Sequence, residues 1–441
     1  MSLITKTMKY RIEYNKDLYK WLKDIQYNVF RMKNKAITMA WDWQQFSFGY
    51  KKRFEKYPNQ KEVIGRTLKQ DIYHEVKEWN VGYNSSFCAD SIKEALDKFK
   101  EKKEAILKGE ESIISYKRNG SFPIRAQQIC NLQKEKEHIY KVDLSLLSSK
   151  KAKEEKTKTQ VNVTLRAGSG ASDIMDRVIN NEYKMADSRI IYNQRKKRFF
   201  LLLTYKFEPP KVTTNPYRIM GVDLGLVIPA TVTINDIPYS TKYVGNAQEV
   251  EEFVNQIEER KRRIQRARKW AGRGSVGHGV KTRIKPLNKI RNKISNFKDT
   301  KNHQWSRYIV DYAVKNGVGT IQMEDLSGIR EKDKFLKDWT YYDFQYKIEY
   351  KAKEYGINVI KVKPQFTSSR CYRCGAIHRP KDDQKWRSKR DLFTCLNCNY
   401  EAHADRNASE NLSIPSIDKV IEQEKDMWFK KWEKQLNSLV R

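Results

Sequence analysis

Four cysteines near the C-terminus constrain the fold more than any other feature of this chain. Cys371 and Cys374 form one CxxC pair, and Cys395 and Cys398 form a second pair after a spacer of twenty residues. Zn²⁺ takes four thiolates in tetrahedral geometry, and a closed shell of this kind leaves no open position for a substrate. The spacing therefore predicts a structural zinc ribbon over residues 366–400.

Two disulfides are the alternative for these four thiols. Disulfides are rare in reducing compartments, and the sequence shows no signal peptide or other targeting segment. We therefore expect a prokaryotic cytoplasmic location, with zinc on the cysteine frame. Cys88 and Cys130 stand alone in the sequence, so we expect them to be reduced core thiols.

The charge of the chain indicates a polyanionic partner. Its 441 residues include 88 Lys and Arg but only 54 Asp and Glu, which gives a net charge of +34. Nucleic acid or an anionic membrane surface could neutralise this excess. A bilayer span needs a run of about 18 apolar residues, and the sequence has none. The basic residues are spread along the chain, which favours nucleic acid in a long channel and no membrane.

One long basic segment contains no Asp or Glu between Arg260 and Lys298. We expect it to form two helices, about 247–271 and 286–316, joined by a loop at 273–279. Such a run is usually a solvated face, but its self-repulsion is relieved when phosphates neutralise it. The residues predicted to contact nucleic acid are Lys261, Arg262, Arg263, Arg266, Arg268, Lys269, Arg273, Lys289, Arg291 and Lys293.

The N-terminal half predicts a small β-barrel with helices inserted after its first strand. A strand at 6–14 precedes a helical region at 17–108, and short β-rich runs follow, including a hairpin through Arg195–Arg198. The helical region carries aromatic residues followed by basic ones. Such residues can stack bases, although a packed core is the commoner role and the one we expect. These aromatic residues are Trp41, Trp43, Phe46, Phe48, Tyr50 and Phe54.

The second half predicts a domain in which strands are followed by alternating helices and strands. An apolar strand carries Asp223, and further strands in quick succession suggest an antiparallel meander. After the basic helices, a buried strand ends at Glu324 and Asp325. A helix at about 341–355 and a strand at 356–363 then imply a parallel crossover. A final helix begins around Asp405, and this order of strands and helices is that of the ribonuclease H-like fold. The fold class is thus multidomain α+β.

Asp223, Glu324 and Asp405 are expected to meet at one point of this architecture. An isolated acid is more often a helix cap or a surface charge. These three, however, lie on the first strand, the fourth strand and the last helix, the elements whose carboxylates converge in a ribonuclease H-like fold. Carboxylates with open water positions suit Mg²⁺ or Mn²⁺. Two such ions can activate water and stabilise the leaving oxygen in phosphodiester hydrolysis.

Several motifs resemble those of a known family. GVDLGL around Asp223, MEDLSG around Glu324 and HADRNASENL around Asp405 resemble the RuvC motifs of compact RNA-guided DNA nucleases. FTSSRCYRCG and FTCLNCNYEA resemble that family's target-nucleic-acid-binding zinc ribbon. The match spans roughly residues 216–415. SYKRNGSFPIRAQQI is similar to a wedge-domain segment of miniature type V-F CRISPR effectors, which favours these effectors over the related transposon-encoded TnpB nucleases.

The resemblance implies a domain organisation and a set of partners. It implies a wedge β-barrel at 1–16 and 109–215, a helical recognition domain at 17–108, a RuvC nuclease domain at 216–365 and 401–441, and the ribbon at 366–400. It makes Asp223, Glu324 and Asp405 the catalytic ligands of Mg²⁺, and Asn407 is expected to orient its neighbour. Guide RNA and target double-stranded DNA are the implied partners, with base pairing reading the sequence. A homodimer on one guide RNA is implied as well.

The predicted activity is guide-RNA-directed, metal-dependent cutting of both DNA strands at one RuvC site. TnpB remains the related alternative. A catalytically inert nucleic-acid-binding regulator would keep the basic surface without the chemistry, although the three intact carboxylates argue against it. A guide-free nuclease would cut without RNA. The amphipathic segment at 416–441 has no motif partner, so its role is open.

Overall fold

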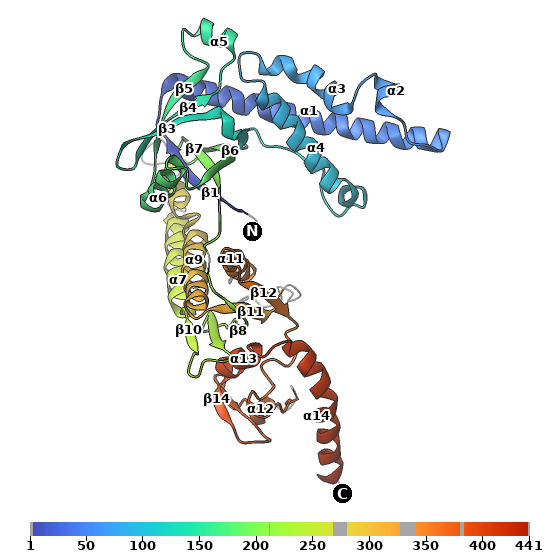
Figure 1. Ribbon diagram of the computed structural model, residues 1–441, viewed down its shortest axis with the longest axis vertical. Coiled ribbons are helices and arrows are strands. Elements are labelled where there is room, and N and C mark those ends of the chain that lie inside the picture. Colours follow the sequence, from blue (N-terminus) through green and yellow to red (C-terminus); the bar gives the residue numbers. More distant parts are fainter. Residues whose placement is uncertain (1–2, 211, 268–279, 327–340, 380–382, 440–441) are drawn as a thin grey trace. The chain divides into compact units, whose positions relative to one another are not determined.

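The computed structural model describes residues 3–210, 212–267, 280–326, 341–379 and 383–439 (Figure 1). The chain divides into two compact units, Met1–Glu208 and Pro209–Arg441. Within the described residues, none of the helices has the length and apolar content of a membrane span.

The first unit contains an antiparallel sheet. Its order, among the described residues, is β2-β6-β7-β1-β5-β4-β3. The predicted hairpin is present, because β6 and β7 pair with Asn193 opposite Arg198. The strands are β1 Ile4–Ile12, β2 Phe122–Ile124, β3 Ile129–Lys136, β4 Ile139–Ser145, β5 Gln160–Arg166, β6 Lys184–Asn193 and β7 Arg198–Phe207.

Helices inserted after β1 share one hydrophobic core with this sheet. Tyr10 of β1, Leu22 of α1 and Phe87 of α4 all belong to it. A short helix, α5, forms between β4 and β5. The helices of this unit are α1 Lys16–Phe54, α2 Gln60–Ile64, α3 Leu68–Val76, η1 Lys77–Asn80, α4 Ser86–Leu107, η2 Ala126–Gln128, α5 Ser149–Glu154 and α6 Ser169–Ile179.

The aromatic residues late in α1 correct one expectation. Trp41 does pack against the core, with its ring 4.9 Å from that of Phe99. Phe46, Phe48 and Phe54 are instead 45%, 43% and 52% exposed. The prediction of a core role is therefore wrong for these three residues. The end of α1 extends beyond the elements that could cover it (Figure 1).

The second unit is built on a mixed sheet with the order β10-β9-β8-β11-β12 among the described residues. Strands β8, β9 and β10 pair antiparallel, as the predicted meander requires. Strand β11 pairs parallel with both β8 and β12. The bounds are β8 Asn215–Asp223, β9 Ala230–Ile234, β10 Lys242–Val244, β11 Val318–Glu324 and β12 Asn358–Val362.

In the described residues between β10 and β11, the chain forms three helices. They are α7 Ala247–Ala267, α8 Val280–Ile290 and α9 Lys293–Lys315. The predicted single helix beginning at Pro286 is wrong, because Pro286 lies inside α8 and a turn at Arg291 and Asn292 separates α8 from α9. Helices α7 and α9 lie side by side (Figure 1), with the rings of Phe253 and Phe297 stacked 4.0 Å apart.

The C-terminal elements surround the cysteines. Helix α11 Tyr341–Lys353 joins β11 to β12, and the ribbon follows with α12 Asp383–Trp386, β13 Leu392–Thr394 and β14 Glu401–His403. The helices α13 Ala404–Leu412 and α14 Ile417–Leu439 complete the unit. Residues of the ribbon, α13 and α14 share one hydrophobic core, which gives the 416–441 segment a packing role.

Candidate active site

The three predicted acids lie around one pocket of about 900 Å³. Asp223 is the last residue of β8, and Glu324 is the last residue of β11. Since β8 and β11 are parallel neighbours, their carboxyl ends meet at the same edge of the sheet. Asp405, in the first turn of α13, lines the same pocket.

Helix α13 reaches this position because it packs directly on the sheet. A methyl group on Gly221 of β8 would lie 2.1 Å from the carbonyl oxygen of Ser409, so only glycine permits the contact. The Gln322 amide of β11 donates to the carbonyl oxygens of Leu412 (2.8 Å) and Ile414 (2.9 Å). These contacts fix the position of α13 against β8 and β11 and, with it, the position of Asp405.

The pocket disfavours negative charge. Burial and the neighbouring carboxylates of Glu324 and Asp405 raise the pKa of Asp223 well above its usual range. Burial raises the pKa of Glu324, although a hydrogen bond from Thr367 opposes this rise. Burial likewise raises the pKa of Asp405. Carboxylates that are ionised together in such a site need a cation to offset their desolvation and repulsion.

The three acids line the same pocket, but their carboxylate oxygens do not all lie within 4.8 Å of one another. In the part of the chain that the structure describes, only the four ribbon cysteines bring three or more ligand atoms within 4.8 Å of one another. Asp325 is exposed, and its amide donates to the carbonyl oxygen of Val362 (2.7 Å). The carboxyl group at the pocket is therefore that of Glu324, as the motif implies.

The ribbon contributes two cations to the pocket that our reading of the sequence missed. Arg387 and Arg390 line the pocket. Arg387 opposes the rise in the pKa of Asp223, and both arginines oppose that of Asp405. The signal was present in the sequence as the basic run KWRSKR between the two cysteine pairs.

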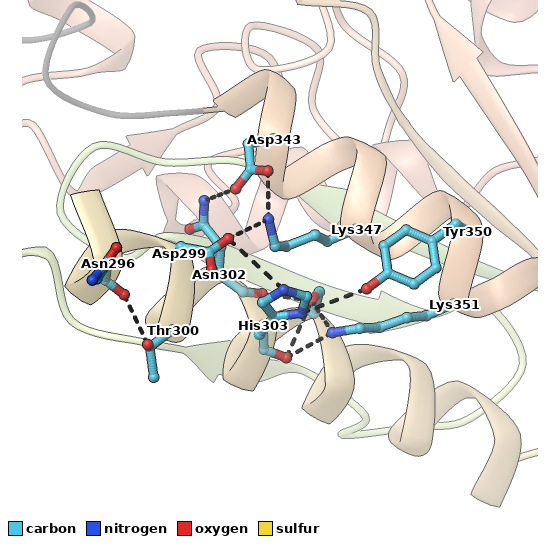
Figure 2. A network of polar contacts seen from close by, with 10 residues as sticks. Asn296, Asp299, Thr300, Asn302, His303, Asp343, Lys347, Tyr350 and Lys351 are labelled. Atoms are coloured by element: carbon cyan, nitrogen blue, oxygen red, sulfur yellow. Dashed lines mark hydrogen bonds and ion pairs between the residues drawn. The ribbon is translucent and has the colours of Figure 1, made fainter. Parts of the chain in front are cut away.

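Helix α11 forms another wall of the pocket and is anchored on α9 by buried lysines. Asp343 of α11 lines the pocket and is ion-paired with Lys347, which also contacts Asp299 of α9 (2.9 Å) (Figure 2). Lys351 donates to the carbonyl oxygen of His303 (2.7 Å), and burial together with Lys351 and Lys347 lowers the pKa of His303. This network stiffens the wall behind the acids.

The four cysteine sulfurs form a compact cluster. The Sγ atoms of Cys371 and Cys398 are 3.8 Å apart, and those of Cys374 and Cys395 are 3.6 Å apart. A hydrogen bond between the side chains of Cys371 and Cys395 raises the pKa of Cys371 and lowers the pKa of Cys395. All six cysteines are free, and burial raises the pKa of Cys88 to about 11. The geometry fits a tetrahedral metal ion.

Asn407 has a different role from the one expected. It is fully buried, its amide donates to the carbonyl oxygen of Arg370 (2.8 Å), and its side-chain oxygen accepts from the Tyr372 amide (3.0 Å). It therefore joins α13 to the first cysteine turn rather than orienting Asp405. The Nδ1 atom of His403 accepts from the Asp405 amide instead (3.3 Å).

The predicted nucleic-acid contacts that fall within the described residues lie on α7, at the end of α8, in the turn that follows it and at the start of α9. Arg262, Arg266, Lys289, Arg291 and Lys293 are exposed. Two others have acidic partners: Lys261 pairs with Glu258, and Arg263 pairs with Glu259 (2.5 Å). Arg268, Lys269 and Arg273 lie outside the described residues.

Comparisons with known proteins decide the family. A family model for the Cas12f1-like TNB domain matches residues 341–412, which include the ribbon with α11 and α13 on either side. The CRISPR-associated endodeoxyribonuclease Cas12f1 of Sulfoacidibacillus thermotolerans is 41% identical over 402 residues, 91% of this chain and 93% of that protein. The chain belongs to the Cas12f1 family.

A second Cas12f1 endodeoxyribonuclease, from Syntrophomonas palmitatica, is 31% identical and covers 82% of this chain and 79% of its own length. A solved Cas12f1–sgRNA–target DNA complex contains a chain that superposes with a TM-score of 0.68. That match covers 94% of this chain and 99% of the other at 18% identity, so it shows a shared mixed α/β fold. The resemblance to miniature type V-F effectors is confirmed by these Cas12f1 relatives.

Proposed function

We propose that this chain is a guide-RNA-directed DNA endonuclease that hydrolyses both strands of its target at a single RuvC site. The observation that carries the proposal is the shared pocket of Asp223, Glu324 and Asp405 in a chain of the Cas12f1 family. Two relatives are named as CRISPR-associated endodeoxyribonucleases, and a structure of the same fold is a complex with guide RNA and target DNA.

Asp223, Glu324 and Asp405 would hold Mg²⁺ or Mn²⁺ in this pocket. A bound divalent cation there would make water a stronger nucleophile and stabilise the leaving oxygen. The raised pKa of Asp223 supports the assignment. Burial and the neighbouring carboxylates destabilise its ionised form, and a bound cation would offset this cost. Arg387 and Arg390 would place positive charge beside the scissile phosphate.

The other parts of the chain would handle the nucleic acids. Residues 1–16 and 109–215 would form the wedge barrel, 17–108 the recognition domain, 216–365 and 401–441 the ribonuclease H-like RuvC domain, and 366–400 a Cys₄ zinc ribbon. The exposed arginines and lysines of α7 and the α8–α9 turn would neutralise phosphates of guide or target. A homodimer on one guide RNA completes the proposal.

Cleavage of a matched DNA by the purified chain with its guide RNA tests this function. We expect cutting in Mg²⁺, none in EDTA and none without guide RNA. Asp223→Ala and Glu324→Gln should bind target DNA but not cut it. Asp325→Asn is the matched control, because it changes an exposed neighbour of Glu324 and should cut normally. Cutting by Asp223→Ala would refute the active-site assignment, and cutting without RNA would support a guide-free nuclease.

A further inference from the structure

Glu324 is held in the pocket by a residue of the zinc ribbon. The hydroxyl of Thr367 bonds to Oε1 of Glu324, and Thr367 is fully buried. The same hydroxyl lies 3.1 Å from the carbonyl oxygen of Pro364. It has one hydrogen to donate, and an ionised carboxylate is the stronger acceptor, so we assign that hydrogen to Glu324.

The backbone of Glu324 is fixed as well. The amide of Gln345 on α11 donates to its carbonyl oxygen at 2.6 Å. The main chain is thus held by α11 and the carboxylate by the ribbon. Among the described residues, Thr367 makes the only side-chain hydrogen bond that the structure gives to the Glu324 carboxylate. The direction in which this carboxylate points therefore depends on Thr367.

Thr367 is itself held by a buried network. The amide of Asn411 on α13 donates to the carbonyl oxygens of Thr367 (3.0 Å) and Arg370 (2.7 Å). The Arg370 guanidinium donates to the side-chain oxygen of Asn411 (2.9 Å) and makes a two-bond ion pair with Glu424 of α14 (2.7 and 2.9 Å). Helix α14 is thus connected, through Arg370 and Asn411, to the residue that orients Glu324.

We propose that Thr367 is a positioning residue of the nuclease site, which holds the Glu324 carboxylate ready for a divalent cation and couples the zinc ribbon to the reaction. The inference rests on the proposed function. Threonine suits this role because its methyl group fills the buried space while its hydroxyl reaches the acid. Of the two carboxylate oxygens, the hydroxyl contacts Oε1, and within the described residues this leaves Oε2 available to a cation.

The test compares Thr367→Ser with Thr367→Ala, a pair that differs by one oxygen atom. Each variant is assembled as the full chain with guide RNA and matched DNA, and its cleavage rate is measured against Mg²⁺ concentration. We expect Thr367→Ala to raise the half-saturating Mg²⁺ concentration about tenfold or more, as is typical for loss of a bond that orients a metal ligand. Thr367→Ser should stay close to the unaltered chain.

A second readout does not depend on cleavage. Binding of Mn²⁺ to the complex with a non-hydrolysable target is followed by electron paramagnetic resonance, and Thr367→Ala should bind it more weakly than Thr367→Ser. Thr300→Val on α9 is the control, because among the described residues its exposed hydroxyl bonds to the Asn296 carbonyl oxygen alone (2.8 Å) (Figure 2). It should leave both measurements unchanged.

The outcomes separate this inference from the proposed function. Equal Mg²⁺ midpoints and equal Mn²⁺ affinities for Ser and Ala would overturn the role of Thr367. A purely structural role would lower the fraction of active enzyme in Thr367→Ala without moving the Mg²⁺ midpoint, and that result would overturn it too. If Asp223→Ala cuts in the same assay, the nuclease site itself is wrongly assigned. If Asp223→Ala is inactive while Thr367→Ser and Thr367→Ala have equal Mg²⁺ midpoints and Mn²⁺ affinities, only the Thr367 inference fails.

Discussion

Gly221 of β8 and Ser409 of α13 approach so closely that a methyl group on Gly221 would lie 2.1 Å from the Ser409 carbonyl oxygen. The same methyl group would lie 2.4 Å from the Ser413 amide nitrogen, so the obstacle is backbone rather than a movable side chain. This contact lies two residues before Asp223 and sets the distance between the strand and the helix that carries Asp405. The packing of one glycine thus determines the geometry of the acidic pocket.

Gly221→Ala should therefore displace α13. We expect a loss of about 1–3 kcal/mol in the free energy of unfolding, the usual cost of overpacking, together with a large loss of DNA cleavage. Urea unfolding and a cleavage assay measure the two effects. Gly170→Ala in α6 is the control, because a methyl group there meets no atom within 4 Å. An unchanged cleavage rate for Gly221→Ala would contradict the proposed docking of α13.

The raised pKa of Asp223 predicts a pH-dependent stability of the metal-free protein. The folded state holds this proton more tightly than the unfolded chain does. The resulting stabilisation is fully present below the ordinary carboxyl pKa of about 4 and is lost as the pH rises through the raised pKa. In EDTA at about pH 8, Asp223→Asn should unfold a few degrees above the unaltered chain, because it cannot ionise.

This difference should shrink as the pH falls toward about 5 in a series of thermal unfolding curves. Added Mg²⁺ should stabilise the unaltered chain more than Asp223→Asn. Asp97→Asn, at an exposed position on α4, should unfold like the unaltered chain throughout. A lower melting temperature for Asp223→Asn at high pH would show that ionised Asp223 is not destabilised by its surroundings.

The ribbon cysteines predict one zinc ion per chain, measurable by elemental analysis of the purified protein. Cys371 and Cys395 belong to the core that also includes Trp428 of α14. Cys371→Ser should therefore lose the metal and several kcal/mol of stability, since metal binding is part of the folding free energy. Cys130→Ser, outside the ribbon, should keep its zinc. Full zinc content in Cys371→Ser would mean that the metal is bound elsewhere.

The exposed arginines of α7 predict a salt-dependent contribution to nucleic-acid binding. Replacing both Arg262 and Arg266 by alanine should lower the slope of log affinity against log salt by about 1–2, because each lost phosphate contact removes about 0.7–0.9. Fluorescence anisotropy of labelled guide RNA over a range of KCl concentrations gives this slope. Lys315→Ala, at the far end of α9, is the control. An unchanged slope for the double variant would place the phosphates elsewhere.

Local patterns predicted a large part of the architecture. The apolar run ending at Asp223 and the strand ending at Glu324 indicated β8 and β11 because apolar β-branched residues mark buried strands. The motif at Asp405 indicated the start of α13, and the amphipathic 416–441 segment is helical. Asp223 and Glu324 were placed at strand ends by their immediate neighbours, so no distant contact was needed to find them.

The expectations that failed concern residues whose environment depends on contacts with distant parts of the chain. Phe46, Phe48 and Phe54 were expected in a core, yet they are exposed because α1 continues past its packing partners. Pro286 was expected to start a helix, but the preceding residues are helical as well. Asn407 stands beside Asp405 in the motif but turns to the ribbon backbone, since a buried amide must satisfy its hydrogen bonds.

The sequence alone determined the cysteine frame and the ends of the strands that carry Asp223 and Glu324, because each is encoded by spacing and periodicity over a few residues. Only the tertiary structure decided that the Thr367 hydroxyl bonds to Glu324, that Arg387 lines the pocket and that Gly221 lets α13 pack closely on β8. These contacts join segments tens to hundreds of residues apart. Their geometry follows from close packing and hydrogen-bond satisfaction in the folded chain, which no local pattern records.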